Sequence, residues 1–366
     1  MRKADIFIHV MVDGLCTMLA LMVFALFHHV LPMKQEAMQV VIENPFEETK
    51  TPEVTAESVL RILSYDADDL LSGPGQSKKQ NRSGRKNNAN GKGGSSLTVD
   101  EDAQVSGDNL VPLQEKFAEL YTDRAVITDC SYTGPNLAIT VSEETDGNIK
   151  YYVADIHVRD ITCIRSALAQ DTYGSGFRDS IENMALLHQA LLAVNGDYYG
   201  NTNEGVVIRN GVIYRANPTA CDVCVLYYDG RMQVMSGASF SVEDAIEEGA
   251  WQAWTFGPAL LDYDGGVLDT FDSTSHILSA NPRTAIGYYE PGHYCLVVVD
   301  GRGESSGITL KEFSRLFYRM GCKAAYNLDG GNSSIMVWNQ EIINTPSGGG
   351  RESSDAIIIS EVIADE

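Results

Sequence analysis

Short hydrophobic runs separated by turn residues dominate the chain from about residue 112 to its C-terminus. Several are rich in Val, Ile and Tyr, and some alternate hydrophobic with polar positions, as strands do. The pattern predicts strands at residues 138–141, 150–158, 206–208, 223–228, 294–299 and 356–359. Asn210-Gly211, between two such runs, predicts a tight hairpin, because this pair accepts the positive φ that the turn needs.

Two segments have a helical pattern instead. Residues 180–194 carry an apolar face that starts at Ser180, a residue type that caps helix N-termini. Residues 309–320 are amphipathic and end before Gly321. No internal repeat is evident. We therefore expect a single large α+β domain at residues 112–366, with an extensive mixed or antiparallel sheet and a few flanking helices.

A mostly apolar segment at residues 6–31 precedes this domain. Its length suits a transmembrane helix, although His9 and Asp13 interrupt it. Arg2 and Lys3 come before it, which predicts a cytoplasmic N-terminus and an extracytoplasmic C-terminal domain. Bulky residues at 27–29 do not fit a cleavage site, so residues 1–33 predict a cytoplasmic tip and an uncleaved signal anchor. The expected location is the cell membrane, in a single-pass topology.

Residues 34–111 lack the pattern of a folded core. Residues 34–72 are acidic and permit helix, and we interpret them as a stalk. Residues 73–111 are rich in Gly, Ser, Asn and Lys and nearly devoid of apolar side chains, so they predict a flexible linker. Basic residues between Lys78 and Lys92 leave attachment to an anionic surface open as an alternative to a solvated tether.

Charge and cysteine usage restrict the possible partners. The formal net charge is −23, and most of it falls after residue 112, so nucleic acid is not an expected partner. Cys221 and Cys224 have the spacing of half a zinc site or a redox pair, but no second pair accompanies them, and an incidental role or a local disulfide stays open. The sequence assigns no metal ligands and requires no cofactor, while leaving room for a divalent cation. It does not indicate an oligomeric state.

Residues with chemical potential cluster where predicted strands begin or end. They are Asn195 and Asp197, Arg283, Asp300 and Arg302, and the run from Asn327 to Ser334. In that run, the consecutive Gly330 and Gly331 permit a turn with positive φ and leave backbone N–H groups open to a ligand. An isolated Asp-Gly pair is often only a hairpin turn. Several segments of the same kind favour a site.

Together with residues 344–351, these motifs closely resemble the phosphodiester glycosidase family, from about residue 120 to the C-terminus. The most specific motif is NLDGGNSS at residues 327–334. Asn332 stands where a third glycine is common in the family, and Asp197 where glycine or alanine is frequent. The resemblance implies a hydrolase that cleaves the anomeric C–O bond of a sugar-1-phosphodiester, similar to an N-acetylglucosamine-1-phosphodiester, in a glycan, cell-wall or exopolysaccharide polymer.

The resemblance and the side-chain chemistry together suggest roles. Asp329 and Asp300, with Asp197 third, are the candidates for stabilising a cationic transition state or activating water. Arg283, Arg302 and Arg351 could hold phosphate, since a guanidinium matches its oxygens with two hydrogen bonds. The further candidates for substrate binding are Asn195, Asn327, Gly330, Gly331, Ser333 and Ser334.

Structural alternatives exist for several of these residues. Asp300 could cap a turn with Arg302 as its ion-pair partner, and Arg283 could be an exposed arginine at a strand edge. Asn195 and Asn327 could bind sugar hydroxyls or satisfy buried backbone groups. No histidine stands in a comparable motif, which disfavours a Ser-His-Asp hydrolase.

Two other functions remain open from the sequence. The first is a non-catalytic module that binds a sugar-phosphate polymer near the membrane. The second is a metal-dependent phosphodiesterase that cuts P–O, with Asp197, Asp300 and Asp329 as an oxygen-rich cation site.

Overall fold

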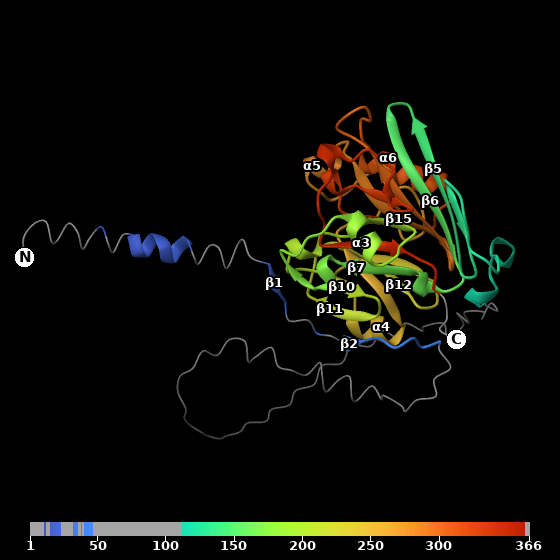
Figure 1. The fold of residues 1–366 in the computed structure, drawn as a ribbon, viewed down its shortest axis with the longest axis horizontal. Coiled ribbons are helices and arrows are strands. Elements are labelled where there is room, and N and C mark those ends of the chain that lie inside the picture. Colours follow the sequence, from blue (N-terminus) through green and yellow to red (C-terminus); the bar gives the residue numbers. More distant parts are fainter. Residues whose placement is uncertain are drawn as a thin grey trace, which may run out of the picture. The chain divides into compact units, whose positions relative to one another are not determined.

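The computed structural model describes residues 11, 15–22, 32–35, 38, 40–46 and 112–362 (Figure 1). Residues 11 and 15–22 are helical. In the described parts of the chain, no helix has the length and apolar character needed to cross a bilayer. Three predicted segments lie wholly or mostly outside the described residues. They are the anchor at residues 6–31, of which most is not described, residues 47–72 of the stalk, and the linker at residues 73–111.

Strands account for most of the regular structure. They are β1 (Met33–Lys34), β2 (Val40–Val41), β3 (Val126–Ile127), β4 (Ser131–Thr133), β5 (Leu137–Asp146), β6 (Ile149–Val158), β7 (Ile164–Leu168), β8 (Gly174–Ser175), β9 (Leu192–Asn195), β10 (Val206–Arg209), β11 (Val212–Ala216), β12 (Asp222–Tyr227), β13 (Met232–Ser236), β14 (Ala250–Thr255), β15 (Arg283–Glu290), β16 (His293–Val299), β17 (Ala324–Asn327), β18 (Met336–Trp338), β19 (Glu341–Ile342) and β20 (Asp355–Ile359).

Helices are few and short. The α-helices that carry element labels are α3 (Ile181–Leu187), α4 (Val242–Glu247), α5 (Ser275–Leu278) and α6 (Leu310–Arg319). Single 3₁₀ turns are η2 (Leu113–Glu115), η3 (Ala118–Leu120), η4 (Ile161–Cys163), η5 (Ala169–Asp171), η6 (Tyr199–Asn201), η7 (Gly331–Ser333) and η8 (Ser347–Gly349).

Antiparallel pairing arranges the strands in three larger sheets. Their orders are β17-β15-β16-β6-β5-β4-β3, β13-β12-β14-β10-β11-β2 and β19-β18-β9-β20-β7, and β1 pairs with β8 separately. Within the described residues, all strand pairs are antiparallel. The predicted domain, a largely antiparallel sheet structure with few helices, is therefore confirmed, and the mixed alternative is not needed.

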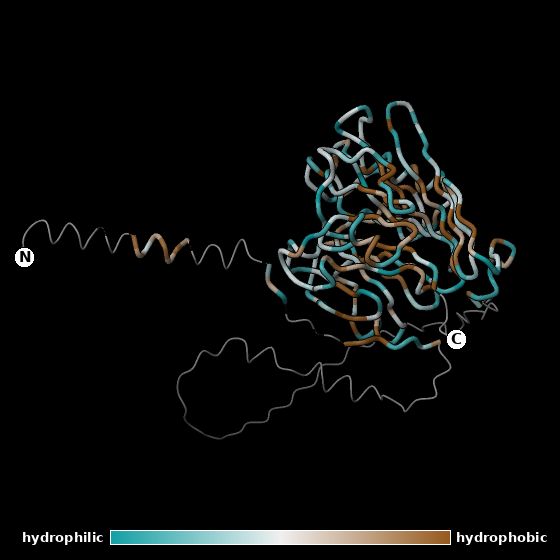
Figure 2. The backbone as a smooth tube through the Cα atoms, viewed as in Figure 1, coloured by the Kyte–Doolittle hydropathy of each residue, from teal (hydrophilic) through white to brown (hydrophobic). Residues whose placement is uncertain are grey.

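One hydrophobic core joins the three sheets. It contains Leu296 of the seven-stranded sheet, Trp254 of the six-stranded sheet and Ile357 of the five-stranded sheet, all nearly inaccessible to solvent. Figure 2 shows hydrophobic residues following the strands and hydrophilic residues concentrated in the connecting loops. On its other face, the seven-stranded sheet packs against α6 through Phe313 and Phe317. Burial against a sheet thus explains the amphipathic pattern of α6.

The predicted strands and the Asn210-Gly211 hairpin are confirmed, whereas the predicted helix at residues 180–194 is only half right. Ser180 does cap α3, where its side chain accepts a hydrogen bond from the backbone N–H of Asn183. However, α3 ends at Leu187, and residues 192–195 form strand β9 between β18 and β20. The consecutive buried side chains of β9 fit the centre of a sheet, and sheet pairing outweighs the helical periodicity that precedes them.

The first part of the predicted stalk belongs to the folded domain. Val40 and Val41 pair with the edge strand β11, and Ile42 is 2% exposed. Met33 and Lys34 pair with β8. The boundary placed at residue 34 is therefore wrong for these residues, because the edge of a sheet offers unpaired backbone groups that an extended segment can satisfy.

Strand register brings the chemically promising segments together. Arg283 at the start of β15 lies opposite Val299 at the end of β16, and Ala285 lies opposite Asn327 at the end of β17. The side chain of Asn195, at the end of β9 in the next sheet, donates a hydrogen bond of 2.7 Å to the carbonyl oxygen of Asp329. The motifs therefore meet where one end of the seven-stranded sheet approaches the five-stranded sheet.

Candidate active site

A cavity of about 420 Å³ opens at this end of the seven-stranded sheet. The predicted site residues that line it are Asp329, Gly330, Gly331, Arg283, Arg302 and Arg351. They come from the ends of β15, β16 and β17 and from the segment that precedes β20. The three predicted phosphate-binding arginines and one of the three predicted catalytic carboxylates therefore line one cavity.

The carboxylate of Asp329 is held firmly at the edge of this cavity. Its Oδ2 accepts a 2.7 Å hydrogen bond from Arg351, and its Oδ1 accepts one of 2.9 Å from the backbone N–H of Gly330. Arg351 also donates to the hydroxyl oxygen of Ser333. Burial raises the pKa of the Asp329 carboxyl above its usual value, while Ser333, Arg351 and the Gly330 N–H act in the opposite direction.

The two glycines serve close packing rather than open donor groups. Gly331 has φ of +67°, and a Cβ on Gly330 would lie 2.8 Å from the carbonyl oxygen of Pro282. The N–H of Gly331 donates to that same oxygen, and the N–H of Gly330 is bound to Asp329. The expectation that both N–H groups stay free for a ligand is therefore wrong. The glycines instead let the Asp329 loop lie against the turn before Arg283.

Arg283 is a buried cation with neutral partners. Its guanidinium donates to the carbonyl oxygens of Ile308 (3.1 Å), Ser279 (2.9 Å) and Ile277, and no carboxylate of the described residues pairs with it. Burial lowers the pKa of Arg283 to about 10, so it remains charged at neutral pH. The alternative of an exposed arginine at a strand edge is therefore wrong.

Arg302 lines the cavity from an exposed turn. It adopts a left-handed backbone conformation with φ of +61°. Its guanidinium donates to the side-chain oxygens of Asn332 (3.1 Å) and Asn281 (2.8 Å). It forms no ion pair with Asp300, so the proposed turn pairing of these two residues is wrong. Asn332, which replaces a common family glycine, contributes here by accepting a hydrogen bond from Arg302.

Asp300 does not line the cavity. Its carboxylate accepts hydrogen bonds from the side-chain amide of Asn344 at 2.9 Å and from the backbone N–H of Thr345 at 3.1 Å. Burial raises the pKa of its carboxyl, and these two donors oppose the shift. The structure therefore places Asp300 as an anchor for the segment that leads to Arg351, and the expected catalytic position is not observed.

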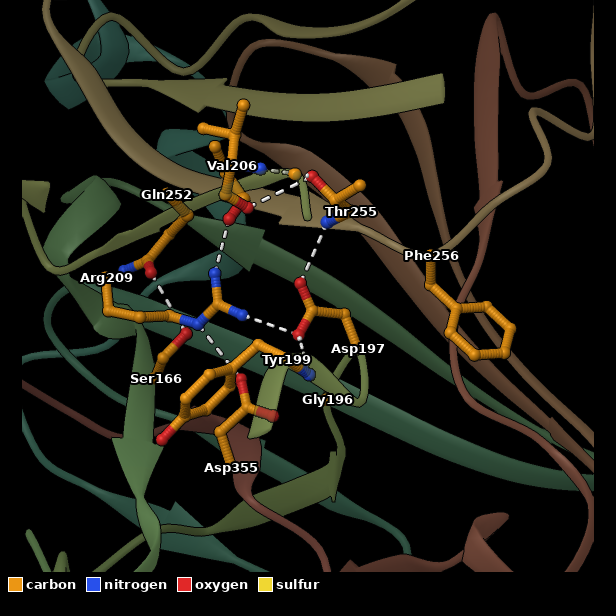
Figure 3. A network of polar contacts seen from close by, with 12 residues as sticks. Ser166, Gly196, Asp197, Tyr199, Val206, Arg209, Gln252, Thr255, Phe256 and Asp355 are labelled. Carbon is orange, nitrogen blue, oxygen red and sulfur yellow. Dashed lines mark hydrogen bonds and ion pairs between the residues drawn. The ribbon is translucent and has the colours of Figure 1, made fainter. Parts of the chain in front are cut away.

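Asp197 lies beneath the cavity in a buried ion network (Figure 3). Arg209 lies between Asp197, at 2.8 Å, and Asp355, at 2.9 Å, and all three side chains are almost completely buried. The other contacts of Asp197 are the backbone N–H groups of Tyr199 (3.1 Å) and Thr255 (2.8 Å). Every one of these partners is structural, so Asp197 does not face the cavity as the sequence suggested.

This buried network supports a strained segment of the site. Tyr198, between Asp197 and Tyr199, has φ of +72°, which is unusual for a bulky residue. Its ring lies 5.5 Å from the Arg351 guanidinium, the group that binds Asp329. The hydrogen bond from the Tyr199 N–H to Asp197 thus fixes the backbone next to Tyr198, whose aromatic face lies under Arg351.

Asp197, Asp300 and Asp329 each have separate partners and do not form a common cluster. Among the described residues, one group has the His, Cys, Asp or Glu arrangement of a metal site, and it contains none of these three. The oxygen-rich cation site expected for a metal-dependent phosphodiesterase is therefore not formed by these carboxylates.

The remaining predicted binders are buried beside the cavity. The Asn195 side chain bridges strands, because its oxygen also accepts a hydrogen bond from Thr284. The Asn327 amide donates to the carbonyl oxygen of Gly257, while its Oδ1 has no hydrogen-bond partner. The Oγ of Ser334 is likewise without one. Ser333 alone of the two serines contacts the charged groups of the site.

Several cavity residues were not selected from the sequence. Tyr198, Phe256, His276 and Asn281 all line the cavity, and Tyr198 and Phe256 meet edge to face. Tyr198 and Asn281 adjoin predicted motifs, so proximity to Asp197 and Arg283 was a usable signal. Phe256 follows β14 and His276 lies in α5, both outside the predicted motifs, and the fold brings them here.

Comparison with known proteins agrees with this geometry. Residues 188–360 match the family described as phosphodiester glycosidase. These residues form a phosphodiester glycosidase domain. The matched range contains every candidate site residue from Asn195 to Arg351. The resemblance inferred from the motifs is therefore confirmed.

This phosphodiester glycosidase domain is similar to a protein encoded by a bacterial prophage. The SPbeta prophage-derived uncharacterized protein YomE of Bacillus subtilis (strain 168) is 28% identical over 266 residues, which are 65% of this chain and 40% of that protein. The chain thus spans less than half the length of this relative.

Two solved structures are also similar. The catalytic domain of zebrafish N-acetylglucosamine-1-phosphodiester alpha-N-acetylglucosaminidase, auto-inhibited by its pro-peptide, aligns with a TM-score of 0.49 and 21% identity, over 62% of this chain and 83% of that one. A hypothetical protein from Synechocystis aligns with a TM-score of 0.48 and 13% identity, over 62% of each chain.

The buried network of this phosphodiester glycosidase domain should dominate its stability. Replacing Arg209 with Met leaves Asp197 and Asp355 buried without their cation, so Arg209→Met should lower the free energy of unfolding by about 3–5 kcal/mol. As a control, Arg231→Met breaks half-exposed ion pairs with Asp229 and Glu248 and should cost no more than about 1 kcal/mol. Urea unfolding of both variants measures the difference. Equal losses would contradict the special role of the buried network.

Proposed function

We propose that this protein is a hydrolase that cleaves the anomeric C–O bond of sugar-1-phosphodiesters. The observation that carries the proposal is the charge arrangement of the cavity. Two arginines that lack carboxylate partners, Arg283 and Arg302, share the cavity with the buried carboxylate of Asp329. The two arginines would bind an anion, and the carboxylate would stabilise a developing cation.

The buried charge of Arg283 supports phosphate as the anion. Removing a cation from water without a counter-ion is costly, and three carbonyl oxygens compensate only in part. A phosphate group in the cavity would supply the missing charge. Arg302, held by two neutral amides, would bind the same group from the other side.

The proposed chemistry follows from the leaving group. A phosphate monoester departs readily as an anion, so its bridging oxygen needs positive charge nearby more than it needs a general acid. The sugar becomes cationic at C1, and Asp329 would stabilise that charge or activate the attacking water. Asp329 is the one carboxylate that lines the cavity among the described residues. Ordinary glycosidases use a pair of carboxylates, and an activated leaving group removes the need for the second.

The zebrafish enzyme is named for N-acetylglucosamine-1-phosphodiesters, so these are the first substrates to test. Hydrolysis in ¹⁸O-labelled water would distinguish the bonds: label in the sugar supports C–O cleavage, and label only in phosphate contradicts it. Retained binding without turnover, across a panel of sugar-1-phosphodiesters, would instead indicate a sugar-phosphate binding module.

The surroundings of the reaction remain predictions from the sequence. They comprise membrane attachment through residues 6–31, an extracytoplasmic position of the domain, and a glycan, cell-wall or exopolysaccharide polymer as substrate. We propose them together with the activity, because a tethered hydrolase would act on polymers close to the membrane.

Asp329→Asn should abolish turnover while substrate binding and folding are retained. Asparagine has nearly the same shape, but it lacks the negative charge proposed to stabilise the cationic transition state. Asp269→Asn is a suitable control, since Asp269 is an exposed carboxylate paired with Lys311 and Arg315. Steady-state kinetics with binding measured in parallel test the prediction. Near-normal turnover by Asp329→Asn would make Asp329 a turn residue only.

The acidic limb of the pH profile should report Asp329. Because burial raises its pKa, kcat/KM should fall as the pH drops through a value above about 3.9, the ordinary pKa of an aspartic acid. Removing the Arg351 cation takes away a group that lowers this pKa, so Arg351→Gln should shift the limb to higher pH. An unshifted or lowered limb in Arg351→Gln would show that another group controls the acidic side.

Arg302→Lys should lower kcat/KM, with a loss of transition-state stabilisation of about 1–3 kcal/mol. Lysine keeps the charge but cannot reproduce the two-pronged hydrogen bonding of a guanidinium. The loss should shrink for a glycoside of the same sugar with a neutral leaving group. Kinetics on the two substrates measure this contrast. An equal loss on both would indicate a positional effect of Arg302 rather than phosphate recognition.

A further inference from the structure

Two histidines and an aspartate cluster at the other end of the seven-stranded sheet. His157 at the end of β6 lies directly opposite His293 at the start of β16. Asp155 precedes His157 by two residues, so its side chain projects from the same face of the sheet. β16 runs from this cluster toward the active-site end over seven residues. The two sites are therefore about 20 Å apart along the strand, at roughly 3.3 Å per residue.

The potential ligand atoms of this cluster face one another. Oδ1 of Asp155 is 2.8 Å from Nε2 of His293, and its Oδ2 is 3.6 Å from Nδ1 of His157. One ligand atom from each residue lies within 4.8 Å of the others. With metal–ligand bonds of about 2.1 Å, tetrahedral neighbours are separated by roughly 3.4 Å. The two Asp–His separations bracket that value, and the stacked imidazoles would turn out of their parallel arrangement to direct both nitrogen lone pairs at one ion.

We propose that Asp155, His157 and His293 bind a divalent transition-metal ion of the zinc class. Two imidazoles and one carboxylate suit zinc and its neighbours, whereas magnesium and calcium prefer ligand sets made of oxygen. Three protein ligands leave a fourth position for water. The Asp155 side chain is 42% exposed, which lets its carboxylate move and gives the ion access from solvent.

Aromatic rings pack around the imidazoles. Tyr289 stacks on His293 at 4.1 Å, and His293 stacks on His157 at 3.9 Å. Phe117 meets the edge of both imidazoles from the segment that precedes the sheet. An apolar shell of this kind limits the access of water to the ligands, as it does in metal sites.

The bound ion would support the surface of the sheet on which the N-terminal segment packs. The segment at residues 112–120 carries Phe117 over the histidines, and Lys116 of the same segment forms a 2.6 Å ion pair with Glu290 beside them. Joining His157 of β6 to His293 of β16 would stabilise the surface on which this segment packs. The site is thus structural in character and separate from the proposed catalysis.

An ordinary ion pair offers a matched comparison. His188 and Asp171 approach to 3.1 Å without belonging to the three-residue cluster. The proposed site differs in having a second imidazole directed at the same carboxylate. His188→Gln therefore removes a His–Asp contact of the simple kind, while Asp155→Asn, His157→Gln and His293→Gln each remove one proposed ligand.

Titration of metal-free full-length protein with zinc ions, in competition with a chromophoric chelator, tests the proposal. The unmodified protein and His188→Gln should share a tight site, and each cluster variant should bind at that site at least about tenfold more weakly. Cobalt titration of the same proteins should give visible absorption bands that the cluster variants lose. Circular dichroism establishes that each variant is folded, and Asp155→Asn, at a partly exposed position, guards against misfolding as the cause.

Each result decides the matter. Absence of a tight site in the unmodified protein, or unchanged binding by Asp155→Asn and the histidine variants, overturns the proposal. Loss in the histidine variants with full binding by Asp155→Asn overturns the three-ligand site. Loss in all three variants, with normal binding by His188→Gln, supports it.

Discussion

The buried cation of Arg209 is the interaction on which the candidate active site depends. It lies on β10 of the six-stranded sheet, contacts Asp355 at the start of β20 in the five-stranded sheet, and contacts Asp197 just after β9. Two carboxylates and one guanidinium are all removed from water, which is costly unless their geometry is well matched. Asp355 shows the strain of this arrangement, since burial and the Asp197 charge raise its pKa while Arg209 opposes them. The network thus joins two sheets at the point where the chain turns toward the cavity.

From this network, contacts lead to the chemical groups. Asp197 accepts a hydrogen bond from the backbone N–H of Tyr199, next to Tyr198. The Tyr198 ring lies under Arg351, and Arg351 binds Asp329. On the other side, Asn195 holds the carbonyl oxygen of Asp329. The position of one carboxylate is therefore determined by three sheets. Such support is what a site needs in order to hold a charged group in a fixed orientation before a ligand arrives.

The charged groups at the cavity differ in whether their hydrogen-bond partners are charged or neutral. Asp329 has a cation beside it, whereas Arg283 and Arg302 are held only by neutral oxygen atoms. The cavity therefore contains two guanidinium groups without a carboxylate partner, in a chain whose net charge is −23. The acidic surface and the basic cavity are compatible, because local partners determine the potential inside a cleft more than distant exposed charges, which salt screens.

What the sequence determined by itself was local. Alternation and turn residues predicted β5, β6, β10, β12, β16 and β20, Ser180 marked the start of α3, and the NLDGGNSS motif with its companion segments identified the family. Apolar periodicity could not separate α3 from β9, because the buried strand was recognisable only from its neighbours β18 and β20. Nor could it show that residues 40–42 complete the edge of a sheet. Asp197, Asp300 and Asp329 were all catalytic candidates from the sequence, with Asp197 third, since each follows a strand and precedes a glycine or an aromatic residue. Only the tertiary structure decided their roles. Asp197 is paired with Arg209, Asp300 is bound by Asn344 and Thr345, and Asp329 lines the cavity. The physical reason is that a carboxylate's role depends on its burial and its partners, and these partners come from segments far away along the chain.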